Sequence, residues 1–242
     1  MIKVCLVGYG KWGKVLFKKL KDITRVVKVL NSTNYNIKSL MDVDWVVIAT
    51  PNKSHYRIIK SCIKIKKNIF CEKPLVLKLH QAKEIYKLAK INGVKVVVSD
   101  LSEYKKKIKI LKTNNNFIRS KKSQYNTNHK FNKYDSLYRF AYHDIGYLYE
   151  FVKNKKIRSI DVILSKKILN FSIKFGNSNF TFYYDANNKN KIYKFNNVSL
   201  LQKKDIIKKM FVDYLIKNKS TKLNKKKSLF IIKVLELIKS KF

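Results

Sequence analysis

The sequence has 242 residues, and its 55 Lys and Arg against 15 Asp and Glu give a formal net charge of +40. Hydrophobic residues make up 45% and recur in blocks, which excludes a disordered chain, while no apolar run approaches the roughly 20 residues that cross a membrane. The start lacks the pattern of a signal peptide and the three cysteines have no paired spacing, so a cytoplasmic protein with reduced, buried thiols is expected.

The first hundred residues alternate apolar strands with amphipathic helices. Short β-branched runs predict strands at 2–7, 25–30, 44–50, 68–71 and 94–99. Helical spacing of apolar residues follows Gly13 and returns over 55–65 and 79–91. This rhythm is typical of a parallel, doubly wound sheet and predicts an α/β domain over residues 1–104.

The pattern changes after residue 104. The lysine-dense stretch 104–111 is predicted to be helical, the run of asparagines at 113–116 to be a loop, and the polar stretch 119–135 to be a connecting or lid-like segment. Further along, a helix is predicted at 142–152, alternating strands at 157–164, 168–175, 179–184 and 191–195, and helices at 203–218 and 226–240. Residues 105–242 are therefore expected to form a shortened α+β domain with a mostly antiparallel sheet. Its two C-terminal helices could also pack back on the first domain, and the sequence leaves this open.

A glycine motif directly follows the first predicted strand. It comprises Gly8, Gly10 and Gly13, with Tyr9, Lys11 and Trp12 between them. In this spacing the backbone can approach a pyrophosphate closely, and the helix that begins there offers unpaired N–H groups and a partial positive charge. We therefore predict a Rossmann-type dinucleotide site. The alternative is a glycine turn in an unrelated α/β fold.

The choice between NAD and NADP stays open at the sequence level. The acidic residue that normally holds the ribose hydroxyl after the second strand is missing, and Asn31 stands there with Ser32 and Thr33 beside it. An asparagine can hydrogen-bond a hydroxyl without repelling a 2′-phosphate. However, no arginine lies nearby in the sequence to bind such a phosphate.

Two further polar blocks follow the third and fourth predicted strands, where doubly wound folds bind their ligands. They contain Thr50, Pro51, Asn52 and His55 in the first block, and Glu72, Lys73 and Pro74 in the second. Together with the glycine motif and a later His-Asp-Ile block at 143–145, these residues resemble the glucose–fructose oxidoreductase / inositol dehydrogenase / MocA family of NAD(P)-dependent dehydrogenases. The resemblance is specific over residues 1 to about 100 and looser beyond.

The resemblance implies roles for individual residues. Lys73 matches the family's catalytic lysine beside the nicotinamide, Pro74 the proline that commonly follows a cis peptide bond, and His143 the family's catalytic histidine. Lys73 and His143 are thus expected to relay the proton of the reacting hydroxyl, with a capping or packed histidine as the alternative for His143. The blocks around Thr50 and Glu72 are expected to shape the cofactor site, with His55 as a cofactor-side or structural residue.

Two departures from the family put the chemistry in question. Arg139 stands four residues before His143, where the family has an aspartate, so either Asp144 or a substrate group replaces that carboxylate, or the activity is altered or lost. In addition, the second domain is shorter than in the family, whose members usually run beyond 300 residues. The substrate pocket is therefore expected to be smaller or more open.

The resemblance implies an oxidoreductase that moves a hydride between NAD or NADP and a hydroxyl or keto carbon of a sugar or nucleotide sugar. The first alternative is a member that binds the cofactor but is catalytically degenerate. A homo-oligomer is expected, because the family's second-domain sheet commonly mediates dimerisation. No metal site is expected, since no His, Cys or carboxylate cluster has ligand spacing.

The charge of +40 supports a weaker alternative, a lysine-rich protein that binds polyanions. Only five of the 55 basic residues are arginine, the residue best suited to phosphate and base contacts, and the lysines are spread along the whole chain. Lys, Asn and Ile are encoded by A/T-rich codons, so a low-GC genome accounts for the composition. We therefore expect no specific nucleic-acid partner. The positive field would at most speed the capture of anionic cofactors and substrates.

Overall fold

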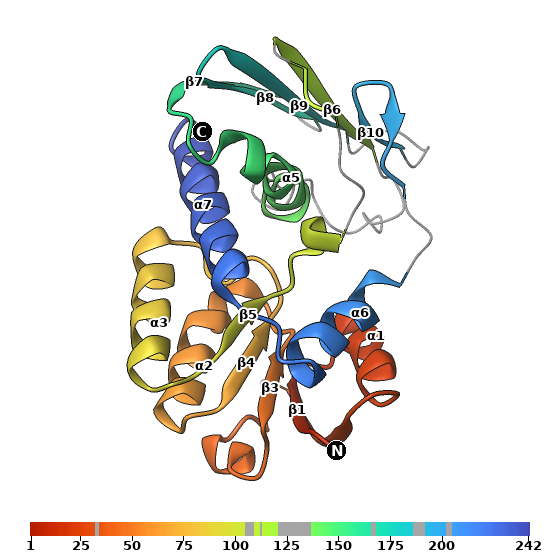
Figure 1. Cartoon of the computed structure of the whole chain (residues 1–242), viewed down its shortest axis with the longest axis vertical. Helices are drawn as coiled ribbons and strands as arrows, with labels where there is room; N and C mark the ends of the chain where they lie inside the picture. The colour runs from red at the N-terminus through yellow and green to blue at the C-terminus, as the bar shows by residue number, and fades with distance from the viewer. Residues whose placement is uncertain are drawn as a thin grey trace. The chain divides into compact units, whose positions relative to one another are not determined.

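The computed structural model describes residues 1–31, 34–104, 109–111, 113–120, 137–165, 168–185, 192–201 and 205–242. The chain divides into two compact units (Figure 1). The first unit comprises Met1–Leu101 and Asp205–Ile232, and the second comprises Ser102–Lys204 and Lys233–Phe242. Within the described part of the chain, no helix has the length and apolar character needed to cross a membrane.

The first unit contains the predicted parallel sheet. Its strands are β1 (Lys3–Val7), β2 (Arg25–Leu30), β3 (Trp45–Ile48), β4 (Asn68–Cys71) and β5 (Val96–Val98), in the order β2-β1-β3-β4-β5. Every pair is parallel, and all four residues of β3 are buried, as expected where helices cover both faces of a sheet. The strand order reverses between β1 and β3, which is where doubly wound sheets bind ligands.

Helices cover both faces of this sheet. They are α1 (Lys11–Leu20), α2 (Asn52–Lys64), α3 (Leu79–Ile91) and α6 (Ile206–Phe211), with a π-helical turn at Val212–Ile216 and short 3-10 turns at Ile37–Leu40 and Leu101–Tyr104. Figure 1 shows α2 and α3 on one face and α1 with α6 on the other. The prediction of a doubly wound α/β fold is thereby confirmed.

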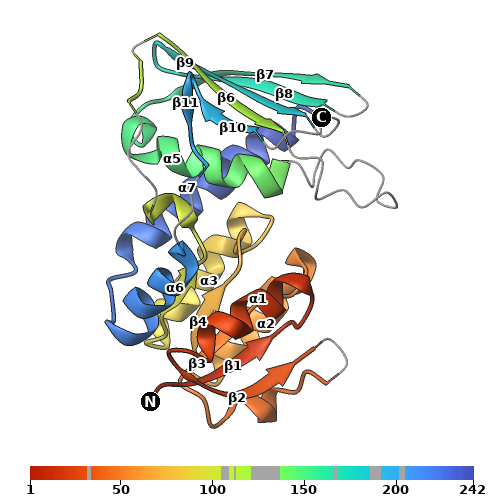
Figure 2. The same cartoon turned by 90° about the vertical axis from the view of Figure 1, so that its right-hand side faces the viewer.

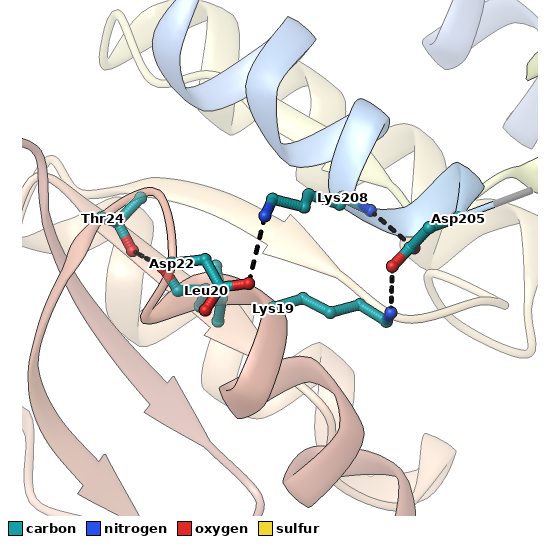
Figure 3. Close-up of polar contacts among 6 residues, drawn as sticks. All are labelled: Lys19, Leu20, Asp22, Thr24, Asp205 and Lys208. Atoms are coloured by element: carbon teal, nitrogen blue, oxygen red, sulfur yellow. Dashed lines mark hydrogen bonds and ion pairs between the residues drawn. The ribbon is translucent and has the colours of Figure 1, made fainter.

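Helix α6 brings a C-terminal segment onto the first unit. Figure 3 shows two ion pairs that cross between α6 and the end of α1: Lys19 pairs with Asp205, and Lys208 Nζ lies 3.1 Å from Asp22 Oδ2. Both pairs are partly exposed, and such pairs contribute at most about 1 kcal/mol each. Burial of Phe211, whose ring lies 4.8 Å from that of Phe70, stabilises the packing further.

The long helix α7 (Lys222–Lys239) contributes polar groups to the open edge of the sheet at β5. The Asn224 amide accepts a hydrogen bond from the Val98 N–H at 2.8 Å and donates one to the Val98 carbonyl at 2.9 Å. One turn along, Lys227 Nζ lies 3.2 Å from Asp100 Oδ2, and both side chains are buried. The Asn224 side chain thus makes the two hydrogen bonds with the Val98 backbone that a neighbouring strand would make, and it covers the sheet edge at this position.

The second unit is a six-stranded sheet whose buried face packs against α5 (Tyr142–Val152), as Figure 2 shows. Its strands are β6 (Asn114–Ser120), β7 (Ile157–Leu164), β8 (Ile168–Phe175), β9 (Ser178–Asp185), β10 (Ile192–Phe195) and β11 (Val198–Ser199). The order is β11-β10-β6-β9-β8-β7, with only the β6–β9 pair parallel, so the mostly antiparallel sheet is confirmed. Inner-face aromatics stack: the Phe171 and Phe117 rings lie 4.5 and 5.2 Å from that of Phe182.

Several local predictions about the second half of the sequence were wrong. The asparagine run predicted as a loop lies largely in β6, and at 109–111, the described end of the predicted helix 104–111, the chain is not helical. The predicted helix 203–218 corresponds to α6 and its π-helical turn over 206–216, and residues 203–204 lie outside the described residues. Residues 105–108 and 121–136, which include most of the predicted connecting segment, lie outside the described residues.

Candidate functional site

The glycine turn after β1 is shaped by two contacts that exclude any side chain. Gly8 has φ +106°, and a Cβ there would lie 2.6 Å from the Ala49 carbonyl carbon; a Cβ at Gly13 would lie 2.0 Å from the Gly8 oxygen. A Cβ at Gly10, by contrast, would meet no protein atom within 4 Å. Gly8 and Gly13 therefore allow strand and helix to pack closely, while Gly10 leaves open backbone at the start of α1.

The start of α1 suits an anion. Gly10 is the N-cap and provides no side-chain hydrogen bond, and the first turn carries no acidic residue. The first N–H groups of the helix thus remain available for an external acceptor. The residues present fit the pyrophosphate of a dinucleotide, and the open space at Gly10 is the observation that supports the fit.

Asn31 lies beside this turn at the end of β2. The Gly8 N–H donates to the Leu30 carbonyl at 2.7 Å, which places the residue after Leu30 next to the glycine turn. The Asn31 amide oxygen accepts from the Asn34 N–H at 3.0 Å, and the Asn34 side chain accepts in return from the Asn31 N–H. Ser32, also predicted to contact the cofactor, lies outside the described residues.

The second block follows β3 and touches the glycine turn. Ala49 donates its N–H to the Val7 carbonyl at 2.8 Å and lies against Gly8. The Thr50 hydroxyl accepts from Ser54 Oγ at 2.7 Å, and α2 begins at Asn52 with Pro51 as its N-cap. Thr50, Pro51 and Asn52 thus form the turn that enters α2 at the carboxyl edge of the sheet.

The third block, at the end of β4, is connected to the glycine motif through Glu72. Burial raises the pKa of the Glu72 carboxyl, and hydrogen bonds from the Trp12 indole and the Ser99 hydroxyl oppose that shift. The Lys73 N–H donates to Glu72 Oε2 at 3.3 Å, and the Lys73 side chain is half-buried. The Lys73–Pro74 peptide bond is cis, as the resemblance implies.

His55 joins the second and third blocks from within. Its side chain is fully buried, with Nε2 at 2.9 Å from the Thr50 carbonyl oxygen and Nδ1 at 3.0 Å from that of Pro74. Cys71 Sγ lies 3.3 Å from Nδ1, and burial raises the pKa of this thiol well above its usual value. All three predicted blocks therefore meet at one edge of the sheet.

His143 belongs to the second unit, in the first turn of α5. Its side chain is largely buried, at 9% exposure, and the Tyr142 ring stands edge-on to it at 5.9 Å. Arg139 lies four residues earlier, exposed, in a π-helical turn at Leu137–Ala141. In the described residues no group of three or more His, Cys, Asp and Glu side chains could hold a metal ion.

Asp144, next to His143, is fully buried and accepts three hydrogen bonds from the sheet. Arg119 Nη2 lies 2.9 Å away, the Tyr184 hydroxyl 2.9 Å and the Tyr193 hydroxyl 2.7 Å. Burial opposes the charge of Arg119, but Asp144 and the two tyrosines together outweigh it, so the pKa of the guanidinium is raised. The Asp144 carboxylate, one of the groups that could replace the family's aspartate, thus has no exposed surface and accepts hydrogen bonds at both oxygens.

Sequence reasoning missed the three partners of Asp144. Tyr184 lies at an inward position of the alternating strand β9, and such an inward polar group needs a buried acceptor. That signal was available in the predicted strand 179–184. Arg119 gave no comparable signal, since β6 was not expected.

A parallel sheet of order 2-1-3-4-5, with a glycine turn and two polar strand ends at its switch point, defines a nucleotide-binding α/β fold. Residues 2–100 match the family described as "Oxidoreductase family, NAD-binding Rossmann fold", the glucose–fructose oxidoreductase / inositol dehydrogenase / MocA group that the sequence motifs resemble. Over 122 residues the chain is 29% identical to 2,7-anhydro-N-acetylneuraminate hydratase of Escherichia coli, covering 43% of this chain and 33% of that protein. The match thus spans about a third of that curated relative's length.

Solved structures are similar to the whole chain in fold. The UDP-N-acetylglucosamine 3-dehydrogenase GnnA of Acidithiobacillus ferrooxidans has a TM-score of 0.84 at 10% identity, covering 99% of this chain and 97% of that one. The WlbA dehydrogenase of Thermus thermophilus, in complex with NAD and UDP-GlcNAcA, has a TM-score of 0.78 at 13% identity, covering 98% and 94%. At these identities the similarity establishes the two-part fold alone.

Proposed function

We propose that the chain is an NAD(P)-dependent dehydrogenase or reductase acting on a hydroxyl or keto carbon of a sugar or nucleotide sugar. The observation that carries this proposal is the meeting of three motif blocks at one sheet edge, where Ala49 lies against Gly8 and His55 contacts the carbonyls of Thr50 and Pro74. The family match and the substrates named for the similar solved structures favour sugar chemistry.

The cofactor would be bound by backbone more than by charge. The N–H groups at the start of α1 would hold the pyrophosphate beside Gly8, Gly10 and Gly13, with Tyr9 and Lys11 flanking it. The Asn31 amide would lie near the adenosine ribose. Its side-chain oxygen accepts the Asn34 N–H, and an amide can hydrogen-bond a ribose hydroxyl without repelling a 2′-phosphate, so either NAD or NADP would fit.

The bound nicotinamide would supply the hydride acceptor or donor. In the proposal, Lys73 stabilises the oxygen of the reacting carbon and His143 takes or returns its proton. Glu72 would hold the Lys73 turn against the glycine motif through Trp12. The Asp144 carboxyl group is fully buried, and Arg139 stands where the family has an aspartate, so a silent, cofactor-binding member is the second candidate.

The test is a turnover assay with purified protein, NAD⁺ or NADP⁺, and a panel that contains UDP-N-acetylglucosamine, its 3-keto form and simple hexoses. We expect a change in absorbance at 340 nm with at least one of them, at rates of about 1–10³ s⁻¹. NADH binding with no turnover on the whole panel in either direction would favour the silent member. Absence of both would contradict the proposal.

We further propose that the outer face of the second unit's sheet is a homodimer interface. One row of paired residues crosses five neighbouring strands of this sheet: Ile163, Asn170, Tyr183, Ile118 and Lys194. Lys194, on β10, is the only lysine among these five. In a chain of charge +40, a row that contains a single lysine minimises repulsion between two copies.

Light scattering should therefore give a mass near twice 28.7 kDa. Substitution of Asn170 and Tyr183 by lysine should yield monomers, while Met41→Lys, at an exposed site of the first unit, should not. A monomeric wild-type protein at micromolar concentration would contradict the interface.

A further inference from the structure

We propose that His55 is a positioning residue that ties the turn carrying Lys73 to the turn carrying Thr50, so that its two ring nitrogens control two different properties of the site. The inference rests on the proposed function. It differs from direct cofactor contact, because the His55 side chain is fully buried, with no surface left for a ligand.

The geometry of His55 supports this role. The ring lies on α2, and its nitrogens point to carbonyl oxygens of two separate loops: Nε2 to Thr50 at 2.9 Å, and Nδ1 to Pro74 at 3.0 Å with Leu75 at 3.3 Å. Carbonyl oxygens only accept hydrogen bonds, so each link needs an N–H on the ring: a neutral ring satisfies one of the two loops at a time, and both together require the protonated ring. The Cys71 thiol, held neutral by burial, can donate to Nδ1 when that atom carries no proton.

Each link ends beside a residue of the candidate site. The Thr50 carbonyl belongs to the turn that packs Ala49 against Gly8, and the Pro74 carbonyl belongs to the residue directly after Lys73. Loss of the first link would shift the turn at the glycine motif, which affects cofactor affinity. Loss of the second would shift Lys73, and displacement of a reacting group by about 1 Å costs roughly 100-fold in rate.

Two conservative variants separate the links. The amide nitrogen of glutamine reaches about where His Nε2 lies, and that of asparagine about where Nδ1 lies. His55→Gln should therefore keep the Thr50 link and lose the Pro74 link, and His55→Asn the reverse. His80, exposed in the first turn of α3, provides matched controls through His80→Gln and His80→Asn.

The first readout is NADH affinity against turnover at saturating cofactor. We expect His55→Gln to bind NADH within about threefold of wild type and to lose about 30–100-fold in turnover. His55→Asn should bind NADH about tenfold more weakly and retain turnover within about fivefold. Equal losses in both variants, or wild-type values in both, would overturn the inference.

The second readout needs no ligand and separates this inference from the proposed function. Amide hydrogen exchange should rise about tenfold or more at 75–77 in His55→Gln, and at 50–54 in His55→Asn, with β7–β9 unchanged in both. If wild-type protein neither binds NADH nor turns over, the proposed function fails and the exchange pattern alone decides. Should one variant fail to fold, the other still tests the inference. Hydrogen exchange in that variant that is raised uniformly, or that equals wild type, would contradict the two-link geometry.

Discussion

Asp144→Ala is expected to lower the free energy of unfolding of the second unit by about 3–5 kcal/mol, because it leaves the Arg119 guanidinium buried without its counter-charge. The Arg119 side chain is only 12% exposed, and it also lies 3.7 Å above the Tyr193 ring, so it cannot turn to solvent without breaking further packing. Urea unfolding followed by circular dichroism measures the loss.

Two controls make the Asp144 result specific. Glu150→Ala, at an exposed site on α5, should change the unfolding free energy by no more than about 0.5 kcal/mol. Asp144→Leu combined with Arg119→Met removes both charges and should recover part of the loss, since apolar replacement of a buried pair is often neutral. A loss below about 1 kcal/mol in Asp144→Ala would show that the pair does not hold α5 to the sheet.

Lys73→Met is expected to lower turnover by about 10²–10⁴-fold while NADH affinity stays within about threefold of wild type. The reason is that the proposed role of Lys73 concerns the reacting oxygen, whereas the pyrophosphate is held by backbone groups at α1. Single-turnover absorbance at 340 nm, with the substrate identified by the panel, measures the chemical step directly.

Lys78→Met is the matched control for Lys73→Met. Lys78 is exposed at the start of α3, five residues along the same segment, and carries the same charge. It should leave both turnover and NADH affinity unchanged, so that a general effect of removing one lysine from a highly basic chain is excluded. Equal turnover in Lys73→Met and wild type would remove Lys73 from the chemistry.

Much of the first unit could be predicted from the sequence, because its signals are local. β3 is a short apolar run buried on both faces, and the turn at Gly8 needs a positive φ, which glycine alone adopts without strain. Helix α5 and strand β8 also match their predicted bounds of 142–152 and 168–175, since their apolar periodicity is strong.

The rest depends on contacts between distant segments. Asparagines have low strand propensity, yet β6 forms because β9 and β10 pair on either side of it, and Asn115 exchanges hydrogen bonds with Leu111. In the same way, the hydrogen bond between Asn224 and Val98 of β5 joins residues 126 positions apart, and no local sequence pattern predicts it. The links through His55 were equally invisible, because the ring contacts backbone carbonyls, which every residue has.

If the glycine turn binds a nicotinamide dinucleotide, substitution of Gly10 tests that binding most directly. A Cβ at Gly10 meets no protein atom within 4 Å and the residue has φ −71°, so Gly10→Ala should fold as wild type does. The methyl group would, however, stand where the backbone must approach the pyrophosphate. The measurement is the NADH dissociation constant of both proteins by nicotinamide fluorescence, with melting temperature as the folding control.

We predict that wild type binds NADH with a dissociation constant in the range of about 1 μM to 1 mM, and Gly10→Ala about tenfold or more weakly at an unchanged melting temperature. No binding by wild type, or equal affinity in the two proteins, would show that the glycine turn does not bind the dinucleotide.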